Sequence, residues 1–263
     1  MSVRIDAVFA KGRPAFVAYI MGGDPDLEAS QRVMNALPGA GVDIIELGFP
    51  FTDPMADGPV IEEAGIRARQ AGTTLSSVID MARAFRTTDA DTPVILMGYA
   101  NPVYHMGYED FAETAADAGV DGAIIVDLPP EEDGPVRAAM DANGLSLIRL
   151  ATPTTDAARL PIVVSGSSGF VYYVSMTGVT GAALVSGGSV ADQVARVRTA
   201  ANLPVVVGFG VKTGERAAEI ARDADGVVVG SAIVKALHEE GEDAALALVR
   251  ELAAATHANR RNR

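Results

Sequence analysis

The chain has 263 residues, of which 49% are hydrophobic and 21% charged, and its formal net charge is −13 with a pI of about 4.6. This acidic balance argues against nucleic acid or an anionic membrane as the main partner, and no stretch approaches the roughly 18 apolar residues of a membrane span. Cysteine is absent and the three histidines are far apart in the sequence, so neither a disulfide, a thiol nucleophile nor a Cys or His metal site is expected.

The N-terminus lacks the layout of a secretory signal. Asp6 comes early, and the first apolar run, 15–21, is short and is followed by glycines and acids. A cytoplasmic location is therefore expected. At the other end, residues from about 257 to 263 are basic and are expected to form a flexible, solvated tail.

Short β-rich runs alternate with Ala-rich amphipathic stretches along the chain. Eight runs rich in Val, Ile and Leu are predicted as strands, at 15–21, 42–48, 92–98, 120–128, 145–151, 170–175, 203–210 and 225–232. Helices are predicted between them, such as 59–70, whose small and apolar residues recur at helical spacing on one face. Residues 73–89 are predicted as one extra helix after the second unit.

Near-continuous apolar strands separated by helices indicate a parallel sheet that is buried on both faces. Eight such units in a chain of this length match a single-domain (β/α)8 TIM barrel over 1–263, with parallel strands and extra short helices. An open doubly wound sheet is the alternative. The Gly-rich, uncharged stretch 176–190 is predicted to be a flexible loop, and such loops at a barrel mouth are often lids.

The segment "IELGFPFTDPMADGP", 45–59, carries the first of two candidate acids, Glu46. Strand alternation places Glu46 and Gly48 on one face, and Asp43 on the other, at the solvated bottom rim. If the face of Glu46 points into a barrel, this carboxyl lies near the C-terminal end of its strand, where barrel enzymes carry their chemistry. Burial there should raise its pKa and suit it to proton transfer near neutral pH. A glutamate hydrogen-bonded to loop backbone is the alternative.

The second candidate acid, Asp57, directly precedes Gly58 and Pro59. This order also predicts a helix start in which Asp57 or Gly58 is the N-cap. A second acid on the loop above the first would instead give two carboxylates in different environments, with divided roles. The segment by itself leaves both interpretations open.

Three glycine clusters, at 178–181, 208–210 and 230–232, each follow a β-rich run. Gly230 and Ser231 open the last helix, whose free N–H groups and dipole can hold a phosphate dianion. Barrel phosphate sites lie after the seventh and eighth strands, so these clusters predict a phosphate site, although a turn explains any one glycine taken alone.

An apolar pocket is predicted between the acids and this phosphate site. Five residues near strand ends are its candidates: Tyr19, Met97, Ile124, Tyr172 and Phe209. Taken singly, each of them is equally explained as ordinary barrel core.

Read together and in order, "IELGFPFTDPMADGP", "YYVSMTGVTG", "GFG" and "GSAIVK" resemble the tryptophan synthase alpha-subunit family, and the resemblance runs from about 16 to 235. It implies a lyase that cleaves indole-3-glycerol phosphate to indole and glyceraldehyde 3-phosphate in tryptophan biosynthesis. It further implies no metal and no cofactor in this chain. The implied partner is a beta subunit that carries pyridoxal phosphate and receives the indole, in an alpha2beta2 heterotetramer.

The resemblance also implies roles for individual residues. Glu46 would be the general acid/base, protonating the indole carbon that is released and taking the proton from the neighbouring hydroxyl, while Asp57 would accept the indole N–H. Tyr172 would help to position the substrate, and Thr180 would meet Asp57 when the lid closes. The implied phosphate ligands are Gly181, Gly210, Gly230 and Ser231.

Two departures and two alternatives accompany the resemblance. Tyr19 stands where some relatives have Phe, and Met176 and the uncharged 182–189 replace charged residues found around "GVTG" in many relatives. One alternative is a free-standing lyase that releases indole; the other is a phosphate-binding barrel that regulates a partner without catalysis. The two acids argue against the latter, because negative charge does not help a phosphate binder. Loops at 50–55 and 129–130 are candidates for a partner surface.

Overall fold

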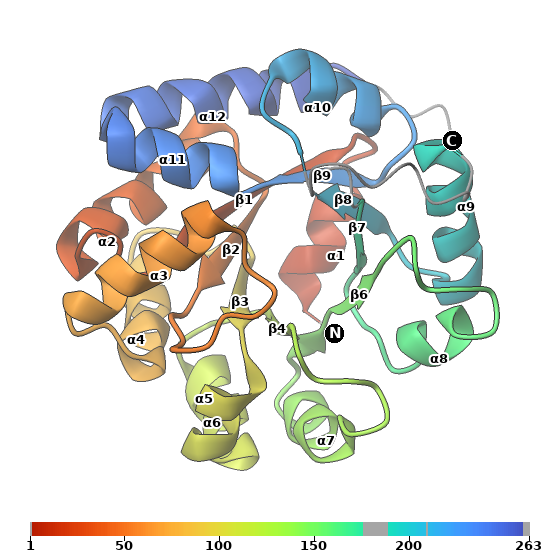
Figure 1. The fold of residues 1–263 in the computed structure, drawn as a ribbon, viewed down its shortest axis with the longest axis horizontal. Helices are drawn as coiled ribbons and strands as arrows, with labels where there is room; N and C mark the ends of the chain where they lie inside the picture. Colours follow the sequence, from red (N-terminus) through yellow and green to blue (C-terminus); the bar gives the residue numbers. More distant parts are fainter. Residues whose placement is uncertain (1, 176–188, 209, 260–263) are drawn as a thin grey trace.

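The computed structural model describes residues 2–175, 189–208 and 210–259, which form a parallel sheet surrounded by helices (Figure 1). The strands are β1 (Ala15–Met21), β2 (Ile44–Gly48), β3 (Val94–Gly98), β4 (Gly122–Ile125), β5 (Ser146–Leu147), β6 (Arg149–Ala151), β7 (Val171–Val174), β8 (Val205–Gly208) and β9 (Gly226–Val229). The helices are α1 (Val3–Phe9), α2 (Leu27–Ala36), the 3₁₀ turn η1 (Pro38–Ala40), α3 (Pro59–Gln70), α4 (Leu75–Phe85), α5 (Ala100–Met106), α6 (Tyr108–Asp117), α7 (Gly134–Ala142), α8 (Leu160–Val164), α9 (Val190–Ala201), α10 (Gly214–Ala221), α11 (Ser231–Glu239) and α12 (Glu242–His257).

The strand order β5-β4-β3-β2-β1-β9-β8-β7-β6 confirms the predicted barrel. The two ends of this order, β5 and β6, are separated in the chain by Ile148 alone, so the sheet is a nearly closed ring and not an open doubly wound sheet. The predicted strand 145–151 therefore exists as two pieces. Its first part pairs with β4 and its second with β7, and a single strand that changes partners in this way joins the two ends of the sheet.

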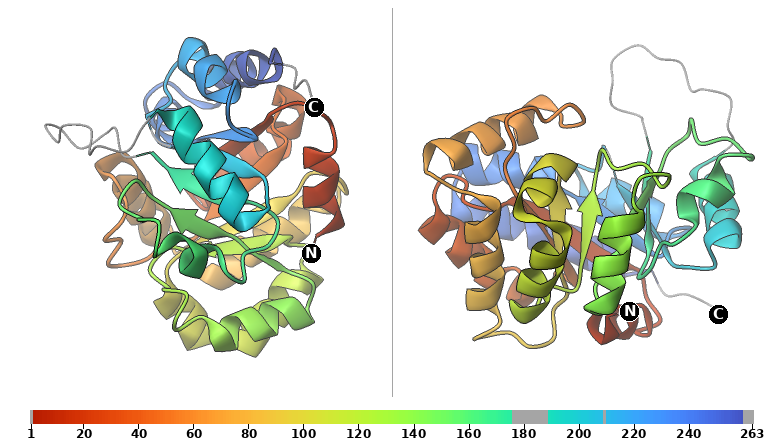
Figure 2. Two further views of the ribbon diagram at one scale, coloured as in Figure 1. Left: turned by 90° about the vertical axis from the view of Figure 1, so that its right-hand side faces the viewer. Right: turned by 90° about the horizontal axis from the view of Figure 1, so that it is seen from below.

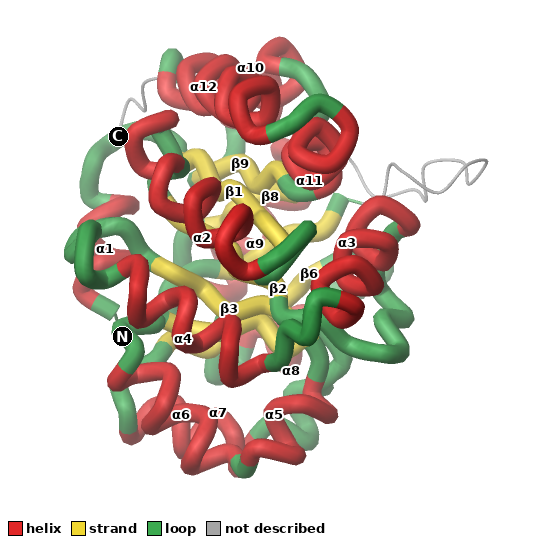
Figure 3. Tube along the Cα trace, turned by 90° about the vertical axis from the view of Figure 1, so that its left-hand side faces the viewer, coloured by secondary structure: helices red, strands yellow, loops and turns green. Residues whose placement is uncertain are grey.

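Two apolar layers form the core. Inside the barrel, side chains such as Val17, Ile44 and Val206 pack together with Ile5 and Val8 of α1, which closes the bottom. Outside it, the opposite faces of the strands pack against the ring of helices seen in Figures 2 and 3. Strand alternation thus sends every second side chain into the barrel, as the sequence predicts.

Two helix assignments need correction. The predicted extra helix at 73–89 is α4, and it contacts α2 and α6, which gives it a place in the outer ring. Two helices, α3 and α4, lie between β2 and β3, and the one added to the outer ring is α3. It contacts β1 and α11 and buries Ala64 and Ala68. The helix that opens at Ser231 is followed by α12, so it is not the last one.

Three aspartates at strand starts tie neighbouring strands together. Each carboxylate accepts a backbone N–H at the start of the adjacent, preceding strand and binds an arginine. The sets are Asp43 with Phe16 and Arg13, Asp121 with Val94 and Arg86, and Asp225 with Val205 and Arg198. Because a buried carboxylate is stable only when it is paired and hydrogen-bonded, these contacts fix the register of the barrel from its lower rim.

Asp43 lies at the bottom rim, as predicted, but it is buried and not solvated. Its carboxylate oxygens form hydrogen bonds of 2.9 Å or less with the side-chain nitrogens of Lys11, Arg13 and His257. Burial alone would raise the pKa of Asp43, but hydrogen bonds from His257, Arg13, Lys11 and the Phe16 N–H hold it well below its ordinary value of 3.8. The carboxylate therefore joins the N-terminal segment, β2 and the C-terminal helix.

Replacing Asp43 by Asn should lower the free energy of unfolding by roughly 2 kcal/mol, because the buried site loses the charged acceptor of its hydrogen bonds from Arg13, Lys11 and the Phe16 N–H, while the partly exposed cations can still be hydrated. Urea unfolding at pH 7 measures the loss. The folded-state pKa lies below the unfolded one, so the contribution is present above about pH 3.8 and disappears as the pH falls through the folded-state pKa. Exposed Asp117→Asn is the matched control, and an equal effect of both substitutions would contradict this role for Asp43.

Candidate active site

Glu46 lies in the barrel interior, near the C-terminal end of β2. It is level with Tyr19 on β1 and Ile95 on β3, and its neighbours Ile45 and Leu47 pack outward against the helices. Its side chain is fully buried, and neither carboxylate oxygen has a hydrogen-bond partner in the described part of the chain. Among the described residues, the structure therefore does not show the alternative, a glutamate hydrogen-bonded to loop backbone.

Burial raises the pKa of Glu46 from 4.5 to about 8. A carboxyl group in this state is mostly protonated at pH 7, and a neutral acid in an apolar cavity is available as a proton donor. An unpaired buried carboxyl is also costly to the fold, which is typical of a group retained for chemistry.

Asp57 lies on the loop between β2 and α3 and is half-buried. Gly58 is the N-cap of α3, Pro59 is its first residue, and no side chain caps the helix. The Asp57 carboxylate is therefore not a helix cap. Burial raises its pKa from 3.8 to about 6; a hydrogen bond from Tyr99 opposes this rise, and the negative charge of Glu62 adds to it. The two acids thus differ in their environments, and near pH 7 Glu46 is mainly neutral while Asp57 is mainly ionised.

Tyr99 is the site residue that the sequence prediction missed. It follows β3 directly, is buried, and its hydroxyl accepts the Ala56 N–H at 3.1 Å. Its ring stacks on Phe51, with ring centroids 5.3 Å apart and planes at 27°. The only sequence signal was its position after Gly98 at a predicted strand end, where barrel side chains reach the mouth.

Two tyrosines reach the site from other strands. Tyr19 lies on β1, beside β2, and Tyr172 lies on β7, beside β8. Both are buried; burial and then the charges of Asp57 and Glu46 raise the pKa of Tyr19, and burial and then Glu46 raise that of Tyr172. Each hydroxyl occupies space that a glycine leaves open, since a Cβ on Gly48 would overlap the hydroxyl of Tyr19, and one on Gly208 would overlap that of Tyr172.

The remaining predicted pocket residues divide into two groups. Met97 lies beside Gly48 and packs on Tyr19, Met21 and the apolar face of α3, at the mouth. Ile124 is next to Met97 in register but is fully buried among the inner-core side chains. Phe209, Thr180 and Gly181 lie outside the described residues, as do Met176 and most of the predicted lid.

The N-terminus of α11 lies beside Tyr19. A Cβ on Gly230, the N-cap, would lie 3.2 Å from the Tyr19 Cβ, and Ser231 begins the helix. No side chain caps this nine-residue helix and no acid occupies its first turn, so its first N–H groups and positive dipole end are available to an anion. Gly210, in the loop after β8, is exposed and has φ +74°, a backbone conformation that favours glycine. Gly210, Gly230 and Ser231 thus all follow C-terminal ends of neighbouring strands.

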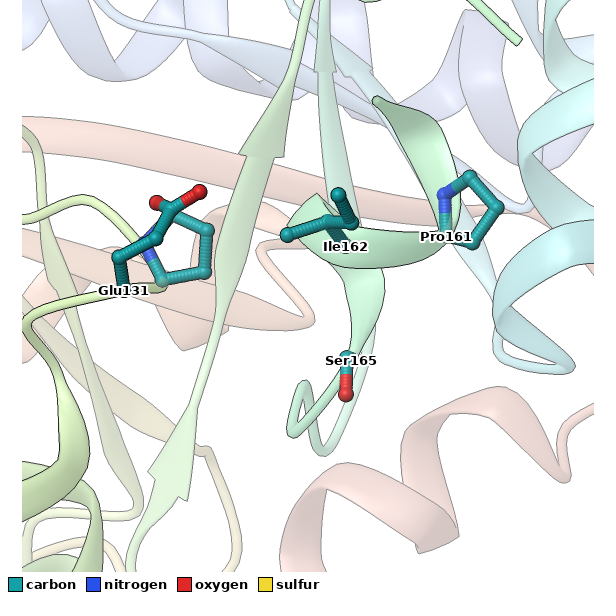
Figure 4. A pocket seen from close by; sticks show the side chains of 5 residues that line it. Glu131, Pro161, Ile162 and Ser165 are labelled. Carbon is teal, nitrogen blue, oxygen red and sulfur yellow. The ribbon is translucent and has the colours of Figure 1, made fainter. Parts of the chain in front are cut away.

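A separate hollow of about 350 Å³ lies between the loop after β4 and α8. Pro130, Glu131, Pro161, Ile162 and Ser165 line it, and Figure 4 shows Glu131 on one side and Pro161, Ile162 and Ser165 on the other. None of these residues belongs to the site above. In the loop 50–55, a candidate for a partner surface, Met55 is 80% exposed, but Pro50 is buried.

Over 2–175, 189–208 and 210–259, no group of three or more His, Asp or Glu side chains has a geometry that would hold a metal ion. None of the helices in that part of the chain is both long and apolar enough to cross a bilayer.

Known proteins resemble this chain over nearly its whole length. The family model for the tryptophan synthase alpha chain matches residues 5–262. The tryptophan synthase alpha chain of Phenylobacterium zucineum (strain HLK1) is 60% identical over 240 residues, which are 90% of this chain and 87% of that protein. The crystal structure of tryptophan synthase subunit alpha from Legionella pneumophila str. Paris has a TM-score of 0.88 at 39% identity, covering 98% of this chain and 100% of that one. A structure of Mycobacterium tuberculosis tryptophan synthase gives 0.89 at 39% identity, covering 98% and 99%.

Proposed function

Because the chain belongs to the tryptophan synthase alpha chain family, we propose that the two acids at the barrel mouth carry out the cleavage of indole-3-glycerol phosphate to indole and glyceraldehyde 3-phosphate. The observation that carries the assignment of roles is the contrast between Glu46, buried and without a hydrogen-bond partner in the described chain, and Asp57, half-buried beside Tyr99. Family membership disfavours the free-standing lyase and the regulatory barrel.

The proposed reaction is a retro-aldol cleavage. Neutral Glu46 donates its proton to C3 of the indole, which makes the ring an iminium cation. The bond between C3 and the glycerol carbon then breaks, and its electron pair returns to the ring. The glycerol hydroxyl on that carbon gives its proton to the Glu46 carboxylate as the aldehyde forms, so Glu46 ends in its initial state.

Asp57 is the proposed electrostatic partner of this step. Its carboxylate accepts the indole N–H and becomes more strongly bound as positive charge develops on the ring, so it stabilises the transition state more than the substrate. Tyr19, Met97, Ile124, Tyr172 and Phe209 are the proposed pocket for the indole and its tail, and Thr180 is the proposed partner of Asp57.

The proposed phosphate site is the N-terminus of α11. Gly230 and Ser231 supply backbone N–H groups there, and Gly181 and Gly210 supply loop backbone from the neighbouring strands. In an acidic chain with net charge −13, local backbone donors are a more suitable way to bind a dianion than a general positive field.

The remaining assignments are proposed together. The whole chain, 1–263, is one barrel domain with a basic tail, it works in the cytoplasm without a cofactor of its own, and it supplies indole to a beta subunit that carries pyridoxal phosphate, in an alpha2beta2 complex. Exposed Met55, two residues before Asp57 along the loop, supports a partner surface at the mouth.

The direct test of the proposed function is indole release. Purified protein with indole-3-glycerol phosphate should produce indole, and a beta subunit should accelerate this strongly. An absence of indole under both conditions would overturn the proposal.

The pH dependence of kcat/KM should be bell-shaped, with limbs near pH 6 and pH 8. Asp57 must be ionised to stabilise the cation, so activity is gained as the pH rises through about 6. Glu46 must be neutral to donate a proton, so activity is lost as the pH rises through about 8. Steady-state rates of indole formation between pH 5 and pH 10 measure both limbs. A profile that is flat from pH 7 to pH 10 would contradict the role of Glu46.

A further inference from the structure

Tyr99 joins the loop of Asp57 to the barrel. The loop's own backbone bonds are local: Met55 N–H donates to the Asp53 carbonyl at 2.9 Å, and Asp57 N–H to the Pro54 carbonyl at 3.0 Å. Tyr99, which extends from the end of β3, contacts the same loop through both its ring and its hydroxyl.

The hydroxyl of Tyr99 can serve two groups of the loop. It accepts the N–H of Ala56 at 3.1 Å, so its own single proton is free to be donated toward the carboxylate of the adjacent residue, Asp57. Donation of this proton agrees with the effect of Tyr99 on the pKa of Asp57. Burial raises that pKa, and Tyr99 opposes the rise, because a hydroxyl that donates to a carboxylate favours the ionised form. The ring is fixed independently by its stack on Phe51.

Tyr99 is itself held at the end of β3. It is only 2% exposed. The N–H of the next residue, Ala100, donates to the Asp127 carboxylate at 2.7 Å, and Asp127 follows β4. A line of contacts therefore runs from β4 through the end of β3 to the loop between β2 and α3.

We propose that Tyr99 is a positioning residue for Asp57: its hydroxyl orients the Asp57 carboxylate toward the indole N–H and holds the 51–57 loop against the barrel mouth. This inference rests on the proposed role of Asp57. It needs no contact between Tyr99 and the substrate, and it makes the hydroxyl, not the ring, the part that matters for the charge state of Asp57.

Tyr99→Phe tests the hydroxyl while keeping the ring and its stack. We expect kcat/KM to fall by roughly 10- to 100-fold, as expected for the loss of an orienting hydrogen bond to a charged group. The acid limb of the pH profile should also move upward, since Asp57 loses a donor while the other groups that face it, Glu62 and Tyr19, are unchanged. A purely structural role would lower stability without moving this limb.

Two matched variants separate the contributions. Tyr173→Phe removes a hydroxyl from a buried tyrosine that faces the outer core, and it should leave both kcat/KM and the acid limb unchanged. Phe51→Leu trims the stack and retains the Tyr99 hydroxyl, so it should reduce activity less than Tyr99→Phe and should not move the limb. If Phe51→Leu reproduces the shift, the hydroxyl is not its cause and the proposal is wrong.

Asp57→Asn distinguishes failure of this inference from failure of the proposed function. If Asp57→Asn retains wild-type rates, the proposed function of Asp57 fails first. If Asp57→Asn is impaired while Tyr99→Phe keeps the wild-type rate and acid limb, only the positioning role is overturned. If both roles hold, adding Tyr99→Phe to Asp57→Asn should lower kcat/KM by a much smaller factor than Tyr99→Phe lowers it in the wild type, because the effects of residues that act as a unit are not additive.

Discussion

Glu46→Gln should reduce the rate of indole formation by a factor of about 10³ or more and leave the affinity for a phosphate ligand nearly unchanged. The amide has the shape of the protonated acid but cannot give up a proton or take one from the glycerol hydroxyl, and general acid-base catalysis contributes about 10² to 10⁴ in rate. Steady-state kinetics and calorimetric titration with glyceraldehyde 3-phosphate measure the two quantities. Wild-type turnover in this variant would exclude Glu46 as the acid.

The same variant should differ from the wild type in the pH dependence of its stability. The folded-state pKa of Glu46, about 8, lies above its ordinary value of 4.5, so the unfolded chain releases this proton first. The wild type consequently loses stability relative to Glu46→Gln as the pH rises from 4.5 to 8, by roughly 4 kcal/mol between pH 5 and pH 9 at about 1.4 kcal/mol per pKa unit. Urea unfolding at both pH values tests this. Glu63→Gln, at an exposed position, is the matched control. It should change neither the rate of indole formation nor the pH dependence of stability.

Asp57→Asn should lower kcat by about 10²-fold with a smaller change in KM. The amide can still accept the indole N–H through its oxygen, but it carries no charge to stabilise the iminium cation, and removal of one preorganised electrostatic group typically costs about 10² to 10³ in kcat. The acid limb of the pH profile, near pH 6, should disappear because the group that titrates there is gone.

The kinetic split identifies the role of Asp57. A variant that only raises KM would mean that Asp57 binds substrate and transition state equally, which would contradict electrostatic stabilisation of the cation. Glu63→Gln on α3 again provides the control, since it removes an exposed carboxylate near the start of the same helix.

The barrel was predictable from the sequence because its strands are continuous apolar runs separated by helical periodicity. The inward face of β2 followed from strand alternation, which fixes Glu46 inside once Ile45 and Leu47 pack outward. The division of 145–151 into β5 and β6 did not follow, because a change of pairing partner at Ile148 depends on where the ring closes and not on local pattern.

Other differences arise from contacts distant in sequence. The burial of Asp43 results from Lys11 and Arg13 before β1 and from His257 at the end of α12, and a short local pattern carries no sign of such pairing. The places of α3 and α4 in the fold depend on which helices each one packs against. Tyr99 was not predicted as a site residue for the same reason. A lone tyrosine after a strand indicates a site only when its loop partners, Phe51 and Ala56, are known.

The most direct measurement is a crystal structure of this protein with a stable substrate analogue that retains both the indole and the phosphate. The predicted result has the Asp57 carboxylate within hydrogen-bond distance of the indole nitrogen, the Glu46 carboxyl next to C3, and the phosphate on the N–H groups of Gly230 and Ser231. An indole bound with its nitrogen directed away from Asp57, or a phosphate bound elsewhere than at the start of α11, would contradict the proposed division of roles between the two acids.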